Sequence, residues 1–145
     1  MVHGHVVVVF TEHLPAQPAP GEHRLHGVRI LPSADTVDVA EYAAVVDALY
    51  GTGLNHAIEG DAAILIHRLN DNPQIPVIAV DIPSGLDGTT GRALGADVVR
   101  AAETVTFHRI KQGLLLRQGV EYTGEITVQP ILIRPGDDID PVSYT

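Results

Sequence analysis

The stretch that decides the fold runs from Ala43 to Ile82 and reads AAVVDALYGTGLNHAIEGDAAILIHRLNDNPQIPVIAVDI. Two apolar runs in it, Ala43–Leu49 and Ile75–Ile82, are rich in β-forming residues and predict strands. The residues between them, Asn55–Asn70, predict a helix. Strand, helix and strand in this order form the βαβ unit of a parallel sheet, so we expect an α/β protein.

The predicted helix has recognisable boundaries and one apolar face. Asn55 is a suitable N-cap, and Pro73 follows shortly after the expected end. The apolar residues of this segment recur at helical spacing and share one face. These residues are Ile58, Ala62, Leu65 and Leu69.

Strands are also predicted outside this unit. Val6–Phe10 is a continuous β-branched run of the kind found in strands that are buried on both faces of a parallel sheet. We expect further strands at Val28–Leu31, Thr104–Phe107 and Ile126–Ile133, the last interrupted by a proline that favours a sheet edge or a bulge. The chain is therefore read as one domain over residues 1–133, followed by an acidic tail over residues 134–145.

The composition restricts the class of function. The 145 residues are 45% hydrophobic, enough for one core, and carry a formal net charge of −9. That charge disfavours binding to nucleic acid or to an anionic membrane, since both require clustered Lys and Arg. The chain has no cysteine, and no apolar run near its start is long enough to cross a bilayer, so a cytoplasmic location is expected.

Two glycines follow the first strand of the central unit. Gly51 and Gly53 permit close backbone approach, and they lead into the predicted helix start, where backbone N–H groups can face an anion. Taken alone, this turn is also typical of an ordinary strand-to-helix connection.

The second segment with chemical content follows the next strand. Asp81 lies at the end of an apolar run, where an ionisable group is costly unless it is paired, hydrogen-bonded or functional. The alternative is that Asp81 only caps nearby backbone N–H groups, and that Ser84 and Gly85 are turn residues.

Lys111 is the only lysine in a chain with eight arginines. A compact ammonium suits contact with a phosphate or a carboxylate, where the planar guanidinium of arginine fits differently. A solvated turn lysine is the alternative interpretation.

Together these segments resemble a known family. VDIPSGLDGTTG at Val80–Gly91 and VVDALYGTGL at Val45–Leu54 are similar to the two central motifs of the NAD(P)H-hydrate epimerases, the YjeF N-terminal domain family. Thr104–Phe107 followed by KQGLL at Lys111–Leu115 resembles a third family segment, with Gln112 in place of the usual proline.

The resemblance implies a fold and a function. It implies a Rossmann-like three-layer α/β fold with a mostly parallel sheet. Members of the family are isomerases that interconvert the R and S forms of hydrated NADH and NADPH, so that a separate dehydratase can restore these damaged cofactors. A homodimer is a further expectation from the family.

The same resemblance implies roles for particular residues. Asp47 and Ser84 would bind a potassium ion, and Asp81 would contact the hydrated dinucleotide and act as the catalytic acid or base. Lys111 is taken as a further contact of the substrate. The remaining expected contacts are Gly51, Thr52, Gly53, Leu54, Asn55, His56 and Ala57.

The chain differs from the family pattern at its amino end. Family members carry helices, a first strand and a Gly-Asn-Asn-Gly-Gly-Asp-Gly loop before the strand that is similar to Val6–Phe10, and these are lacking here. That loop supplies phosphate contacts and a further potassium ligand. The expectation is thus a truncated epimerase, and the alternative is a non-catalytic module that binds a nucleotide or a protein.

Overall fold

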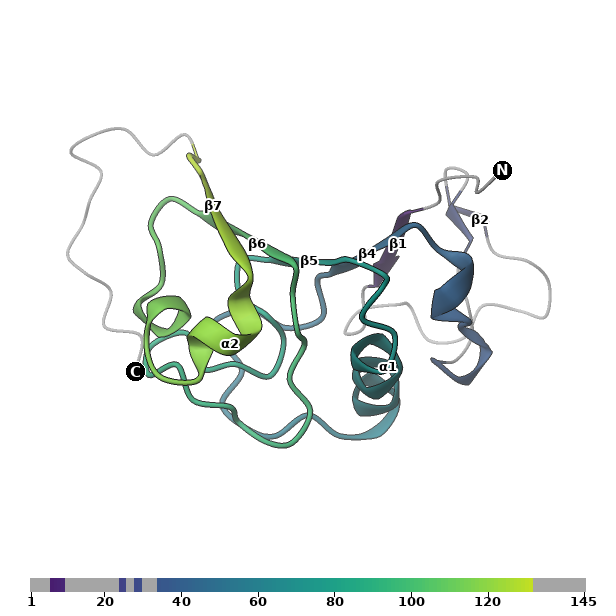
Figure 1. Cartoon of the computed structure of the whole chain (residues 1–145), viewed down its shortest axis with the longest axis horizontal. Coiled ribbons are helices and arrows are strands. Elements are labelled where there is room, and N and C mark those ends of the chain that lie inside the picture. The colour runs from purple at the N-terminus through teal and green to yellow at the C-terminus, as the bar shows by residue number, and fades with distance from the viewer. Residues whose placement is uncertain (1–5, 10–23, 26–27, 30–33, 132–145) are drawn as a thin grey trace.

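A parallel sheet organises the chain. The computed structural model describes residues 6–9, 24–25, 28–29 and 34–131. In this part of the chain, five strands form a sheet in the order β1-β4-β5-β6-β7, and every neighbouring pair is parallel (Figure 1). The strands are β1 (Val6–Val9), β4 (Ala44–Asp47), β5 (Val77–Val80), β6 (Glu103–Phe107) and β7 (Glu125–Gln129). The predicted α/β, Rossmann-like class is confirmed.

The central βαβ unit is present, but its strands are shorter than predicted. β4 ends at Asp47 and not at Leu49, and β5 ends at Val80 and not at Ile82. Asp81 therefore follows β5 and does not lie inside it, because its φ of 70° is incompatible with an extended strand. Both carboxylates consequently lie at the carboxyl edge of the sheet.

The helix of this unit starts later than predicted. Helix α1 spans Gly60–Asn70 with Glu59 as its N-cap, so the assignment of Asn55 as the cap was wrong. Ile58 continued the apolar pattern without being helical, because it packs from the preceding loop into the same core as the helix. The buried residues of α1 are Ala62, Leu65, Ile66 and Leu69.

The later strands agree with the predictions except at their ends. β6 was predicted almost completely, and β7 is an edge strand in the described sheet, which is one of the two positions that the sequence predicted. Pro130 follows β7 directly and does not interrupt it. The predicted strand at Val28–Leu31 is β3, two residues long, and it pairs antiparallel with β2 in a separate small sheet. These strands are β2 (Arg24–Leu25) and β3 (Val28–Arg29).

Short helices complete the described chain. The 3₁₀ helices are η1 (Ala34–Thr36), η2 (Val39–Glu41) and η3 (Gln112–Leu115), and the second α-helix is α2 (Gly119–Thr123). No helix in the described ranges is long and apolar enough to cross a membrane. The predicted acidic tail at residues 134–145 lies outside the described residues.

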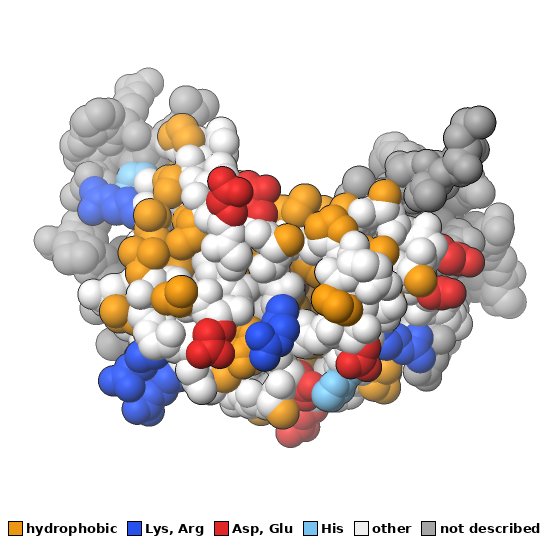
Figure 2. Space-filling model, viewed as in Figure 1, with side chains coloured by type: hydrophobic (Ala, Val, Ile, Leu, Met, Phe, Trp, Pro, Cys, Tyr) orange, Lys and Arg blue, Asp and Glu red, His pale blue; other side chains and the backbone are white. Residues whose placement is uncertain are grey.

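The two faces of the sheet differ in burial. α1 and α2 lie on the same side of the sheet in Figure 1. On the covered face, Val45 and Val77 join the core beneath α1, and Thr104 donates a 2.7 Å hydrogen bond to the carbonyl oxygen of Thr123 at the end of α2. On the opposite face, side chains such as Val46 and Ile78 are only half-buried. Figure 2 shows hydrophobic side chains along this upper side of the molecule.

A junction of glycines joins the loop after β5 to the turn after β6. The amide of Gly113 donates to the carbonyl of Gly88 at 2.8 Å, and the amide of Gly119 donates to that of Gly91 at 3.0 Å. A β-carbon on Gly113 would collide with the backbone of Asp87 and Gly88. The absence of a side chain therefore lets the two segments hydrogen-bond directly.

The loop of this junction is also stabilised from within. The Oδ1 atom of Asp87 accepts hydrogen bonds from the backbone amides of Thr90 at 2.6 Å and Thr89 at 2.9 Å. The bond from Thr90 is the main cause of a lowered pKa of the Asp87 carboxyl. Asp87 thus closes the turn that places Gly88 and Gly91 against the second segment.

Substituting Gly113→Ala should destabilise the protein by about 1–3 kcal/mol, because backbone atoms have to move apart to admit the methyl group. Gly53→Ala is the matched control, since a β-carbon there meets no atom within 4 Å, and it should change stability by less than about 0.5 kcal/mol. Urea unfolding measures both values. Equal stabilities of the two variants would show that the junction is not tightly packed.

Candidate functional site

Ionisable and hydroxyl side chains meet at the carboxyl edge of the three central strands. Asp47 ends β4, Asp81 follows β5, and Thr106 lies near the end of β6. Ser84 and Lys111 reach the same edge from the loops after β5 and β6. In open parallel sheets this edge is the usual place for ligands.

Asp47 and Ser84 form a buried pair. The Ser84 hydroxyl donates to Asp47 Oδ1 at 2.6 Å, and the Ser84 amide donates to Asp47 Oδ2 at 2.8 Å. Each of the two residues is only 1% exposed. A third bond, from the amide of Leu49 to Asp47 Oδ1 at 3.3 Å, completes the set around the carboxylate. This pair connects β4 to the loop after β5.

The same serine holds the loop that follows β4. The amide of Tyr50 donates to Ser84 Oγ at 3.0 Å, and the carbonyl oxygen of Tyr50 lies 3.4 Å from that hydroxyl. Gly51, the first glycine of the turn, comes directly after Tyr50. Ser84 therefore determines where the Gly51–Ala57 segment leaves the sheet.

The surroundings of Asp47 disfavour its charge. Burial raises the pKa of the Asp47 carboxyl, although the hydrogen bonds from Ser84 and Leu49 act in the opposite direction. A cation beside the carboxylate would offset the cost of burying the charge. The carboxylate, the Ser84 hydroxyl and the Tyr50 carbonyl supply oxygen atoms only, which suits a hard ion such as potassium.

Asp81 is held by β6 and the turn behind it. Its Oδ1 atom accepts hydrogen bonds from the Thr106 hydroxyl at 3.1 Å and from the Phe107 amide at 3.3 Å. Its backbone amide donates to the carbonyl of Val105 at 2.8 Å. These contacts keep Asp81 in the left-handed region at a φ of 70°, where a non-glycine residue is strained.

Lys111 forms an ion pair with Asp81. Its Nζ atom donates to Asp81 Oδ1, to the Thr106 hydroxyl at 3.1 Å and to the Phe107 carbonyl at 3.0 Å. The side chains of Lys111 and Asp81 are each 21% exposed, so the pair lies at the border between the core and solvent. The sequence singled out both ionic residues but missed the role of Thr106. The only indication of that role was the position of this polar residue on the buried face of β6.

The glycine-rich segment after β4 borders a cavity of about 290 Å³. The glycine turn was predicted to lead directly into the helix, but it does not, because α1 starts at Gly60. Glu59 and Asp61 flank that start, and two carboxylates there oppose the binding of a phosphate. The cavity is lined by Leu49, Tyr50, Gly51, Gly53, Leu54 and His56.

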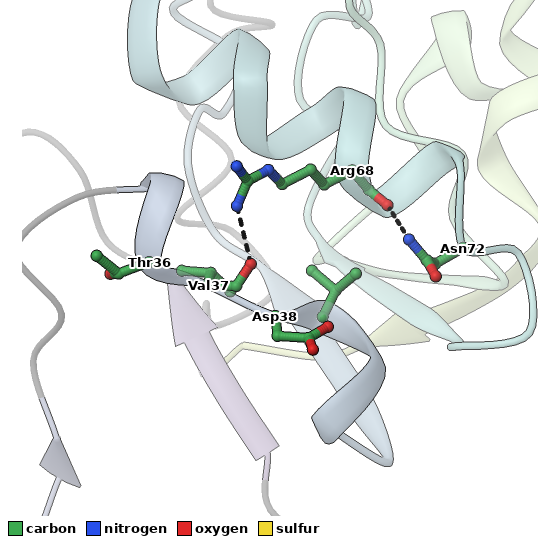
Figure 3. Close-up of a pocket in the computed structure, with 6 residues that line it drawn as sticks. Thr36, Val37, Asp38, Arg68 and Asn72 are labelled. Atoms are coloured by element: carbon green, nitrogen blue, oxygen red, sulfur yellow. Dashed lines mark hydrogen bonds between the residues drawn. The ribbon is translucent and has the colours of Figure 1, made fainter.

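A second cavity, of about 340 Å³, shares no lining residue with the first. Figure 3 shows Arg68 reaching from α1 towards Val37, whose carbonyl accepts a 3.0 Å hydrogen bond from the guanidinium. The same guanidinium donates to the carbonyl of Ala34 at 2.9 Å. Arg68 thus holds the segment around η1 against the helix, and the sequence had not indicated this role.

The raised pKa of Asp47 predicts a pH dependence of stability. A carboxyl whose pKa is higher in the folded state contributes full stability below its ordinary value of 3.8, and the contribution is lost as pH rises through the raised pKa. Asp47→Asn, which does not ionise, should therefore gain stability relative to wild type as the pH rises above 3.8 and through the raised pKa of Asp47. Urea unfolding in potassium-free buffer tests this, and a pH-independent difference would contradict it.

A family model and several known proteins match this chain. The family model described as YjeF-related protein N-terminus matches residues 7–113. The bifunctional NAD(P)H-hydrate repair enzyme Nnr of Pyrobaculum aerophilum is 46% identical over 91 residues, which are 63% of this chain and 18% of that protein. The NAD(P)H-hydrate epimerase of Weissella koreensis is 42% identical over 94 residues, covering 65% and 42% of the two chains.

A third relative gives the widest coverage of these. The NAD(P)H-hydrate epimerase of Limosilactobacillus reuteri is 35% identical over 117 residues, which are 81% of this chain and 54% of that protein. The chain spans about half the length of such epimerases, and less of the bifunctional enzyme. Since the family model covers most of the sequence, the chain belongs to the family of the YjeF-related protein N-terminus.

Proposed function

We propose that this chain carries the catalytic centre of an NAD(P)H-hydrate epimerase, an isomerase that interconverts the R and S forms of hydrated NADH and NADPH. The observation that carries the proposal is the anchored Asp81 carboxylate at the carboxyl edge of the sheet, one strand away from the cavity beside Gly51. Family membership and the names of the relatives support the same reaction.

The reaction requires a proton carrier at the hydrated ring. The R and S forms differ at the carbon that bears the hydroxyl group, so one route breaks this C–O bond and adds water from the opposite face. A proton then has to reach the departing hydroxyl, and another has to leave the incoming water, so that the balance is zero. Asp81 is the proposed carrier: its protonated carboxyl would give the proton to the departing hydroxyl, and the carboxylate that remains would take one from the incoming water.

The dinucleotide would lie along the loop after β4. We propose that Gly51, Thr52, Gly53, Leu54, Asn55, His56 and Ala57 contact it, as the motif resemblance implies. The two glycines are open, since a β-carbon at either meets no atom within 4 Å, so the backbone is accessible to a bulky ligand. Because acidic residues flank the start of α1, we expect the phosphates to contact backbone amides of the loop and not those of the helix start.

Potassium is the proposed cofactor, held by Asp47 and Ser84. When bound, the ion would supply positive charge near the phosphates and would offset the buried carboxylate. We further propose that the protein acts in the cytoplasm together with an NAD(P)H-hydrate dehydratase and forms a homodimer. The bifunctional name of the Pyrobaculum aerophilum relative supports the link to a second repair activity.

Asp81→Asn should lower the epimerisation rate by about 10²–10⁴-fold, because it removes the proton carrier. The assay supplies R-form NADPH hydrate and an S-specific dehydratase, with the dehydratase alone as the spontaneous background. Asp87→Asn is the matched control, since it changes an aspartate in the same loop and keeps an oxygen for the turn amides. A wild-type rate in Asp81→Asn would exclude Asp81, and no conversion by folded wild type would favour a binding module.

Potassium should raise the stability of the folded protein through Asp47 and Ser84. At a potassium concentration about tenfold above Kd, the expected gain is about 1.4 kcal/mol. Thermal unfolding in potassium chloride is compared with choline chloride at equal ionic strength. Ser84→Ala should lose this increment, whatever its own stability, and an equal increment in the variant would place the ion elsewhere.

A further inference from the structure

Lys111 has no hydrogen-bond donor left for a substrate. An ammonium group carries three N–H donors. In this structure Nζ of Lys111 contacts three acceptors of the protein itself, namely Asp81 Oδ1, the Thr106 hydroxyl and the Phe107 carbonyl. A simultaneous hydrogen bond to a phosphate of the dinucleotide would require one of these to break. The geometry therefore differs from the direct ligand contact expected from the sequence.

We propose that Lys111 and Thr106 are positioning residues, which orient the Asp81 carboxylate and do not touch the hydrated nucleotide. The inference rests on the proposed function, in which Asp81 carries the proton. It assigns Lys111 to the rate of the chemical step and not to the binding of the substrate.

The contacts divide the Asp81 carboxylate into two different oxygens. The hydrogen bonds from Thr106, Phe107 and Lys111 that the structure shows among its described residues all end on Oδ1. Oδ1 is thus the anchored oxygen, and Oδ2 is the one available to the reacting ring. A carboxylate fixed through one oxygen presents the other in a constant direction, which is what proton transfer at a single carbon requires.

Thr106 is the link in this arrangement. Its hydroxyl donates its single proton to Asp81 Oδ1 and accepts a hydrogen bond from Lys111 Nζ on a lone pair, both at 3.1 Å. The side chain is fully buried on β6. Removing the hydroxyl while keeping the shape would loosen Asp81 without altering the surface that meets the ligand.

The arrangement also explains a lysine in a chain that otherwise uses arginine. Three acceptors from the neighbouring β5 and β6 segments converge on one point, and a compact ammonium can donate to all three at once. The planar fork of a guanidinium directs its donors outward and does not bring three of them to a single point in the same way. We therefore expect Lys111→Arg to behave like the loss of the lysine.

The first test separates the rate from binding. Thr106→Val and Lys111→Met should each lower kcat by about 10–100-fold, while KM and the Kd for R-form NADPH hydrate change less than about twofold. Thr106→Ser keeps the hydroxyl and should stay within about threefold of wild type. A raised KM and Kd with kcat retained would show that Lys111 contacts the substrate, and an unchanged kcat in Thr106→Val would also overturn the proposal.

The second test does not depend on activity. Because Lys111 is the only lysine, protein labelled with ¹⁵N at the lysine side-chain amine gives a single ammonium signal in NMR. The signal should show slow hydrogen exchange in wild type, lose that protection in Asp81→Asn and keep it when R-form NADPH hydrate is added. Protection that survives Asp81→Asn would refute the positioning role, even in an active enzyme. Protection without epimerase activity would refute only the proposed function.

Discussion

The hydrogen-bonded pair of Asp47 and Ser84 is the contact on which the site depends. Two parallel strands alone leave their following loops free to diverge, and this buried pair ties the end of β4 to the loop after β5 through two bonds of 2.6 and 2.8 Å. The Ser84 hydroxyl also accepts a hydrogen bond from the amide of Tyr50, so the glycine turn and the loop after β5 start from a common point. A charged group is costly at a buried position, so Asp47 requires these hydrogen bonds, and their short distances make the geometry specific.

A second set of constraints fixes the other side of the edge. The glycine junction holds the loop after β5 to the turn that carries Lys111, and backbone atoms approach so closely that no side chain fits between them. Lys111 can therefore reach Asp81 from a turn 30 residues later in the sequence. Packing away from the candidate site thus determines the direction of the Asp81 carboxylate.

Strain and burial are concentrated at this edge. Asp81 has a left-handed backbone, and Asp47 carries a carboxyl whose pKa is raised by burial. Within β4 and β5 themselves, residues alternate in the ordinary way between buried and half-buried positions. Features that cost stability are usually retained where a ligand or a reaction uses them, which agrees with a site at the carboxyl edge.

The sequence alone determined the class of fold and the segments of the site. Periodicity and β-branched runs report which residues face a core, so the βαβ unit and β6 were predictable, and the motifs singled out Asp47, Asp81 and Lys111 as candidate site residues. It did not determine where α1 begins, because Ile58 buries its side chain in the same core whether or not it is helical. Only the tertiary structure decided that Lys111 donates hydrogen bonds to Asp81 and Thr106. Hydrogen bonds between distant segments depend on the register of strands and on glycine packing, and neither leaves a local pattern in the sequence.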